Sequence, residues 1–178
     1  MSKSENLSLV SYDDEWPAQF KIEAQYLMEL LPEESLLEFH HIGSTAIPDM
    51  PAKPIIDLGI MIVSFEDAKE KILPVLEKNG YEYLWREDRT PPFMTFIKKN
   101  EEGIRTHHVH LAEEEHNFWD RLYFREYLKQ NRDEARNYFE LKDQLCKKFT
   151  DDREAYTDGK SDYVAKITAI AKEKIKEF

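Results

Sequence analysis

The stretch at residues 55–63, Ile-Ile-Asp-Leu-Gly-Ile-Met-Ile-Val, constrains the fold of this chain more than any other segment. A strand with one face in water alternates polar and apolar side chains, whereas this stretch is apolar at nearly every position. That pattern is typical of a central strand whose two faces are both covered. The chain is therefore expected to fold around a β-sheet that contains this strand.

The segments on either side of this strand show helical and extended patterns. A helix is expected from Trp16 to about Leu31, where Pro32 ends it, because its apolar side chains share one stripe. The other expected elements are a strand at 36–42, a helix at 66–78, strands at 81–85, 93–98 and 104–111, and helices from 116 onward with breaks near 131, 150 and 159. This order predicts an α+β fold, in which a mixed β-sheet is flanked by helices and followed by a C-terminal helical segment.

The length of 178 residues suits about one domain. A chain of this size buries roughly 70% of its extended surface, so neither a disulfide nor a structural metal is needed to stabilise it. We expect a single domain over residues 1–178, with the sheet in about residues 1–114 and the helical tail in about residues 115–178.

Charge and cysteine content limit the partners and the compartment. The net charge is −11, from 25 Lys+Arg and 36 Asp+Glu, and a polynucleotide partner is not expected because nucleic-acid binding needs a basic footprint. Cys146 is the only cysteine, the N-terminus lacks the apolar core of a signal peptide, and the longest aliphatic run, residues 60–63, is too short to span a membrane. We expect a cytoplasmic protein that binds no membrane and holds a small anionic ligand by a local group of basic residues. The oligomeric state stays open.

Asp57 is a carboxylate inside the apolar strand, and a buried carboxylate must be paired, hydrogen-bonded or bound to a metal. On a strand at 104–111, His108 and His110 point to one face, because side chains alternate along a strand. If the two strands align, Asp57, His108 and His110 converge and can ligate one metal ion or grip one phosphate. The alternatives are a structural ion pair for Asp57 and two solvated or hydrogen-bonded histidines.

Two lysines lie where apolar side chains are expected. Lys142 falls inside the apolar stripe of its helix, and Lys160 opens the apolar face of the last helix. A lysine in such a position must extend to solvent or find an anion. Together the two lysines predict a basic pocket, and the alternative is a structural ion pair for each, for instance with Glu23.

Two further features favour an anion site. Gly43-Ser44 follows an expected strand, and backbone N–H groups at such a turn can cradle a phosphate. Arg125 belongs to a basic stripe on its helix in an otherwise acidic protein. An ordinary turn and a solvated salt-bridge face are the respective alternatives.

Two segments are specific enough to suggest a family: His41-Ile42-Gly43-Ser44-Thr45-Ala46-Ile47-Pro48 and Ala52-Lys53-Pro54-Ile55-Ile56-Asp57. They are accompanied by Trp16-x3-Phe20-x2-Glu23, His108-x-His110, Phe124-Arg125-x-Tyr127-Leu128, Tyr138-x3-Lys142 and Tyr156-x3-Lys160. Over nearly its whole length the chain thus resembles the GrpB family of small bacterial proteins, a branch that resembles the nucleotidyltransferase superfamily.

The resemblance implies a nucleotidyltransferase-like fold and a set of site residues. In that superfamily a Gly-Ser turn grips the triphosphate, while two carboxylates at i and i+2 on a strand and a third on a later strand hold two Mg²⁺ ions. The corresponding positions here are Gly43-Ser44, Asp57, Gly59, and His108 or His110. One aspartate with two histidines is a poor ligand set for two hard cations, so Mg²⁺-dependent nucleotidyl transfer is expected to be weak or absent.

The resemblance favours a protein that binds a nucleoside phosphate and transfers its nucleotidyl group to a small molecule. The residues expected to bind the phosphates are Gly43, Ser44, Lys53, Arg125, Lys142 and Lys160, and those expected to bind a divalent metal and act in catalysis are Asp57, His108 and His110. One alternative is a metal-dependent hydrolase that uses these last three residues with Zn²⁺, Mn²⁺ or Fe²⁺. Another is a noncatalytic nucleotide- or CoA-binding or regulatory module, since the family also occurs fused to dephospho-CoA kinase. Whether the protein is an enzyme stays open.

Overall fold

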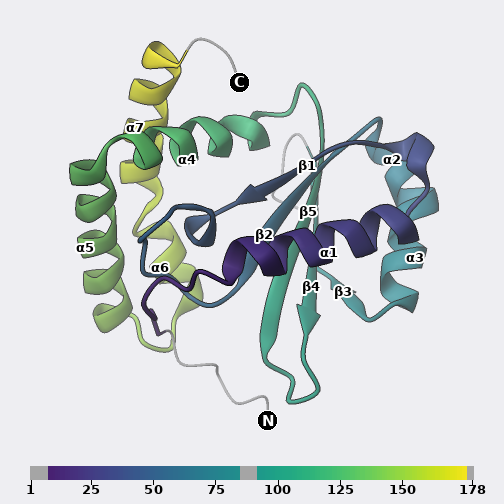
Figure 1. Ribbon diagram of the computed structural model, residues 1–178, viewed down its shortest axis with the longest axis horizontal. Helices are drawn as coiled ribbons and strands as arrows, with labels where there is room; N and C mark the ends of the chain where they lie inside the picture. Colours follow the sequence, from purple (N-terminus) through teal and green to yellow (C-terminus); the bar gives the residue numbers. More distant parts are fainter. Residues whose placement is uncertain (1–7, 85–91, 176–178) are drawn as a thin grey trace. The chain divides into compact units, whose positions relative to one another are not determined.

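A computed structural model describes residues 8–84 and 92–175 (Figure 1). The chain forms two compact units, and neither is one continuous segment. Of the described residues, the sheet unit comprises 14–42, 55–84 and 92–119, and the helical unit comprises 8–13, 43–54 and 120–175. The boundary in the second half of the chain thus follows Trp119, and the segment 43–54 belongs with the C-terminal helices.

The sheet unit contains a five-stranded mixed sheet with the strand order β1-β2-β5-β4-β3. Its strands are β1 (Leu36–Ile42), β2 (Ile56–Ile62), β3 (Tyr81–Tyr83), β4 (Met94–Lys99) and β5 (Arg105–Glu113). β2 and β5 are parallel, whereas the other neighbouring pairs are antiparallel. The predicted α+β fold with a mixed sheet is therefore confirmed, and the apolar stretch at 55–63 is the strand between β1 and β5.

Helices of the sheet unit pack against one face of this sheet (Figure 1). They are α1 (Trp16–Leu30), α2 (Phe65–Asp67), the π-helical turn η3 (Ala68–Ile72) and α3 (Leu73–Lys78), and a short 3₁₀ turn, η1 (Glu33–Ser35), follows α1. Leu58 and Ile60 of β2 and Leu27 of α1 belong to their common core. Because side chains alternate along β2, Asp57 and Gly59 lie on the opposite face of the sheet.

The segment predicted as one helix over 66–78 is helical throughout but is interrupted by the π-helical turn η3. The strands predicted at 36–42, 93–98 and 104–111 agree with β1, β4 and β5 to within two residues. The strand predicted at 81–85 forms over Tyr81–Tyr83, and Trp85 lies outside the described residues.

Among the described residues, the helical unit consists of residues 8–13, the segment 43–54 and four helices. The helices are α4 (Asp120–Gln130), α5 (Arg132–Lys148), α6 (Arg153–Asp158) and α7 (Ser161–Lys174), with 3₁₀ turns at η2 (Ser44–Ala46) and, in the sheet unit, at η4 (Asn117–Trp119). The breaks fall where they were predicted. Ile47 and Met50 are buried in one core with Tyr138, Ile167 and other residues of the helices, which explains why segment 43–54 belongs to this unit. Within the described residues no helix is long and apolar enough to cross a membrane.

Candidate metal and anion sites

Asp57, His108 and His110 lie on the face of the sheet opposite α1. The parallel pairing of β2 with β5 sets Asp57 beside His108 and Gly59 beside His110. Residues that pair across neighbouring strands point to the same face, and residues two apart on one strand do so as well. The predicted convergence of the three side chains is therefore present, and strand register alone produces it.

The three side chains are close enough to ligate a single ion. Asp57 Oδ1 lies 2.9 Å from Nδ1 of His108 and 3.8 Å from Nε2 of His110. One ligand atom from each residue lies within 4.8 Å of those of the other two, and in residues 8–84 and 92–175 no other group of three or more His, Cys, Asp or Glu side chains does so. The side chains keep 15% to 29% of their surface exposed, so the site can be reached from solvent.

Thr95 on β4 fixes the ring of His110. Its Oγ1 lies 2.9 Å from Nδ1 of His110, and Thr95 is buried. With Nδ1 engaged by this hydroxyl, Nε2 is the nitrogen that faces Asp57. A hydrogen bond to the other ring nitrogen is the usual way in which proteins orient a metal-binding imidazole.

The two neighbouring histidines stabilise the ionised form of Asp57. Burial would raise the pKa of Asp57, but hydrogen bonds and charge interactions with His108 and His110 outweigh it and lower the pKa below its usual range. Asp57 is therefore a carboxylate at neutral pH, which is the form that binds a cation.

This ligand set fits one divalent ion of intermediate hardness. One carboxylate oxygen and two imidazole nitrogens are the donors that Zn²⁺, Mn²⁺ or Fe²⁺ accept, and three protein ligands leave room for water or a substrate oxygen. The set does not fit two Mg²⁺ ions, because Mg²⁺ prefers oxygen ligands and Gly59 has no side chain to supply another.

The lysines predicted to bind an anion meet in the helical unit. Lys142 on α5 is 2% exposed. Its Nζ donates hydrogen bonds to the carbonyl oxygen of Pro51 at 2.7 Å and to Oγ of Ser44 at 3.2 Å. Both acceptors come from segment 43–54, so Ser44 of the predicted turn and Lys142 are hydrogen-bonded neighbours.

Lys53 and Lys160 lie against the same aromatic ring. Their Nζ atoms are 4.1 Å and 4.3 Å from the ring centroid of Tyr156 on α6. Burial and the charges of Lys160 and Lys53 lower the pKa of Lys142 to about 7. We call Ser44, Lys53, Lys142, Lys160 and Tyr156 the lysine cluster.

The remaining predicted phosphate-binding residues have other surroundings. Gly43 has a φ of 73°, a conformation that glycine adopts without strain, and precedes the turn η2 that begins with Ser44. Arg125 on α4 forms an ion pair with Glu126, from Nε to Oε1 at 2.7 Å.

Glu23 was the alternative ion-pair partner considered for Lys142 and Lys160. It accepts hydrogen bonds from the hydroxyl of Tyr81 and, at 2.6 Å, from Nζ of Lys98, both within the sheet unit.

Thr95 and Tyr156 were not predicted as site residues. Thr95 pairs with His110 across β4 and β5, and a sequence does not reveal which strands are neighbours. In the Tyr156-x3-Lys160 motif the tyrosine precedes the lysine by four residues. This spacing is a signal that could have placed the ring of Tyr156 beside Lys160.

Comparisons with known proteins agree with this fold. The family model described as GrpB protein matches residues 6–169. A UPF0157 protein of Pseudomonas aeruginosa is 37% identical over 176 residues, which cover 94% of this chain and 68% of that protein. A dephospho-CoA kinase of Mycolicibacterium paratuberculosis is 40% identical over 74 residues, which cover 38% of this chain and 17% of the kinase.

A solved structure shows the same architecture. The crystal structure of the conserved protein GrpB from Enterococcus faecalis superimposes with a TM-score of 0.84 at 32% sequence identity, over 96% of this chain and 100% of that one. The family model covers the sheet unit and most of the helical unit, including Asp57, His110, Lys142 and Lys160. The chain therefore belongs to the GrpB family.

Proposed function

We propose that this protein binds a nucleoside triphosphate through its lysine cluster and transfers the nucleotidyl group to a hydroxyl or amine of a small-molecule acceptor, with pyrophosphate as the leaving group. The observation that carries the proposal is the buried amine of Lys142, held by Ser44 and Pro51. Its charged form is costly in this buried position near Lys53 and Lys160 unless an anion compensates the charge. A phosphate group supplies both the charge and several hydrogen-bond acceptors.

The lysine cluster brings together three lysines from separate parts of the chain. Lys53 lies in segment 43–54, Lys142 lies on α5, and Lys160 directly precedes α7. Three ammonium groups suit the charge of a di- or triphosphate better than that of a single carboxylate. Because Nε of Arg125 is engaged by Glu126, Arg125 would have to bind a phosphate through another N–H group of its guanidinium.

In this proposal Asp57, His108 and His110 hold one divalent metal ion. When bound, such an ion acts as a Lewis acid toward a phosphoryl oxygen. Asp57 supplies the negative charge, and Thr95 keeps Nε2 of His110 directed toward Asp57.

Calorimetric titration with nucleoside triphosphates tests the binding step. Lys142→Met keeps the length of the side chain and removes its charge, and Lys147→Met is the matched control, since Lys147 is exposed on the same helix. Loss of a charge-assisted hydrogen bond predicts an affinity lower by about ten-fold or more for Lys142→Met. Equal affinities of the two variants would contradict the proposal.

Transfer of a labelled α-phosphate tests the reaction. The labelled nucleotide is incubated with a mixture of small alcohols and amines, with Mn²⁺ or Zn²⁺ in one series and Mg²⁺ in another. Metal-dependent label transfer with Mn²⁺ or Zn²⁺, absent in Asp57→Asn and weak with Mg²⁺, is expected. Robust Mg²⁺-dependent transfer that Asp57→Asn abolishes would show that the ligand argument is wrong.

A metal-dependent hydrolase is the second candidate. The observation that favours it is the set of two imidazoles and one carboxylate, which resembles hydrolytic zinc sites with a water in the open position. The same assay, performed in ¹⁸O-labelled water, separates the two reactions. Hydrolysis incorporates ¹⁸O into the product phosphate, whereas nucleotidyl transfer to an acceptor does not. Tight nucleotide or CoA binding with neither reaction would instead indicate a noncatalytic binding module.

A further inference from the structure

The indole ring of Trp119 fills the space above Gly59, next to Asp57 on β2. A methyl group on Gly59 would lie only 2.9 Å from Cζ3 of Trp119 and 3.3 Å from its Cη2. Real side-chain carbons essentially never approach so closely, so no other residue fits at position 59 unless the indole moves. The close approach of a ring to the backbone is therefore the reason for a glycine inside this strand.

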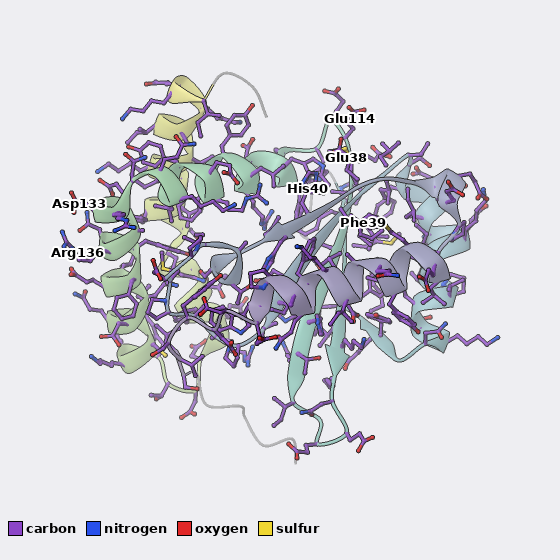
Figure 2. All side chains as sticks on the ribbon, in the orientation of Figure 1. Glu38, Phe39, His40, Glu114, Asp133 and Arg136 are labelled. Carbon is purple, nitrogen blue, oxygen red and sulfur yellow. The ribbon has the colours of Figure 1, made fainter. Side chains whose placement is uncertain are left out.

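Trp119 is held firmly in this position. Its Nε1 donates a hydrogen bond to the carbonyl oxygen of Glu113 at 2.8 Å, and the side chain is buried. Phe118 packs edge-on against the indole at a centroid distance of 5.0 Å. His40, labelled on β1 in Figure 2, packs against it at 5.4 Å. An anchored ring of this kind does not swing aside for a larger side chain without a loss of packing.

Position 59 matters because few neighbours of Asp57 can offer a ligand. Asp57 pairs with Ile42 on β1 and with His108 on β5, and its neighbour along the face of β2 is Gly59. Ile42 has no donor atom, and His108 already belongs to the ligand set. A fourth protein ligand on β2 would therefore have to come from position 59, where Trp119 leaves no room.

We propose that Trp119 restricts the centre of Asp57, His108 and His110 to a single divalent ion of intermediate hardness. Two ions about 3.5–4 Å apart need bridging or additional carboxylates between them, and the space for such a carboxylate is occupied by the indole. The selectivity for Zn²⁺, Mn²⁺ or Fe²⁺ over Mg²⁺ then follows from the nitrogen ligands and the fixed ligand count. This inference rests on the metal binding in the proposed function.

Metal stoichiometry tests the inference independently of any activity. The purified chain is loaded with Mn²⁺, desalted and analysed for Mn²⁺ per chain, and electron paramagnetic resonance distinguishes an isolated ion from a coupled pair. We expect one isolated ion in the wild type and in Trp119→Phe, which keeps an aromatic ring. Asp57→Asn and His110→Ala are expected to bind Mn²⁺ at least about ten-fold more weakly.

Two further variants test the role of the indole. Gly59→Asp alone is expected to retain one ion and to melt at a lower temperature, because the carboxylate collides with Trp119. The combination of Gly59→Asp with Trp119→Ala is expected to show the resonance of a coupled pair. If that double variant does not fold, the ion count of the wild type and of Gly59→Asp still decides the question.

The outcomes separate this inference from the proposed function. A coupled pair in the wild type or in Gly59→Asp would overturn the role of Trp119 and leave metal binding intact. A folded double variant that keeps a single ion would also overturn it. No bound Mn²⁺ or Zn²⁺ in the wild type would refute the metal site itself, while nucleotide binding by the lysine cluster would be unaffected.

Discussion

Replacing Lys142 with methionine should change how the stability of the protein depends on pH. The pKa of Lys142 is lowered from 10.5 to about 7 by burial and by the charges of Lys160 and Lys53. The folded state therefore disfavours the charged amine, and the unfolded state does not. Between pH 7 and 10.5 the unfolded chain binds a proton at this position that the folded chain lacks, so the free energy of unfolding rises with pH.

The size of the effect follows from the two pKa values. Each pH unit between them corresponds to about 1.4 kcal/mol, so keeping the amine charged costs the folded state about 5 kcal/mol below pH 7. Lys142→Met removes this cost and loses the hydrogen bonds to Ser44 and Pro51, at about 1 kcal/mol each. The variant is therefore expected to be more stable than the wild type at pH 6, and this advantage should shrink by about 2–3 kcal/mol between pH 7 and 9.

Urea denaturation at pH 6, 7, 8 and 9 measures this difference directly. Lys147→Met serves as the control, because Lys147 is 76% exposed and forms an ion pair with Asp143 one turn earlier on the same helix. The control should track the wild type within about 0.5 kcal/mol at each pH. A stability difference between Lys142→Met and the wild type that stays constant from pH 6 to 9 would refute the reasoning, since it would mean that Lys142 stays charged in the fold.

Other substitutions test the packing and the metal site. Leu27→Ala, at a fully buried position of α1, should lower the free energy of unfolding by about 2–5 kcal/mol in urea denaturation, and a loss below about 1 kcal/mol would contradict its place in the core. Gly159→Ala should destabilise by about 1–3 kcal/mol in the same assay, because the added methyl would lie 2.6 Å from Cδ2 of Leu145; unchanged stability would mean that Leu145 moves freely. Zn²⁺ at about 100 times its dissociation constant should stabilise the wild type by about 2.7 kcal/mol in a thermal melt, and an equal gain in Asp57→Asn would place the ion elsewhere.

The sheet and the convergence of three site residues could be predicted because both depend on short-range patterns. The apolar run at 55–63 indicates a central strand, and the i, i+2 spacing of His108 and His110 places both rings on one face. Their meeting with Asp57 then required only that β2 and β5 be neighbours, which they are.

The residues that the sequence did not reveal depend on contacts between distant segments. Trp119 is separated from Gly59 by most of the sheet unit, and nothing near either residue predicts that the indole lies over the strand. Thr95 reads as an ordinary strand residue until the order of β4 and β5 is known. Segment 43–54 has no helical pattern of its own, yet Ile47 and Met50 are core residues of the helical unit.

The burial of Ile47 and Met50 among the C-terminal helices affects the order in which the protein can fold during synthesis. Every strand of the sheet unit precedes residue 120 and emerges from the ribosome before the C-terminal helices, so the hydrogen bonds of the sheet can form first. Segment 43–54 can form its contacts only after α5 has been made, because the hydrogen bond from Lys142 to Ser44 joins residues 98 positions apart. The lysine cluster is therefore one of the last features to form, and a chain released before α5 would contain every residue of the candidate metal centre but neither Lys142 nor Lys160.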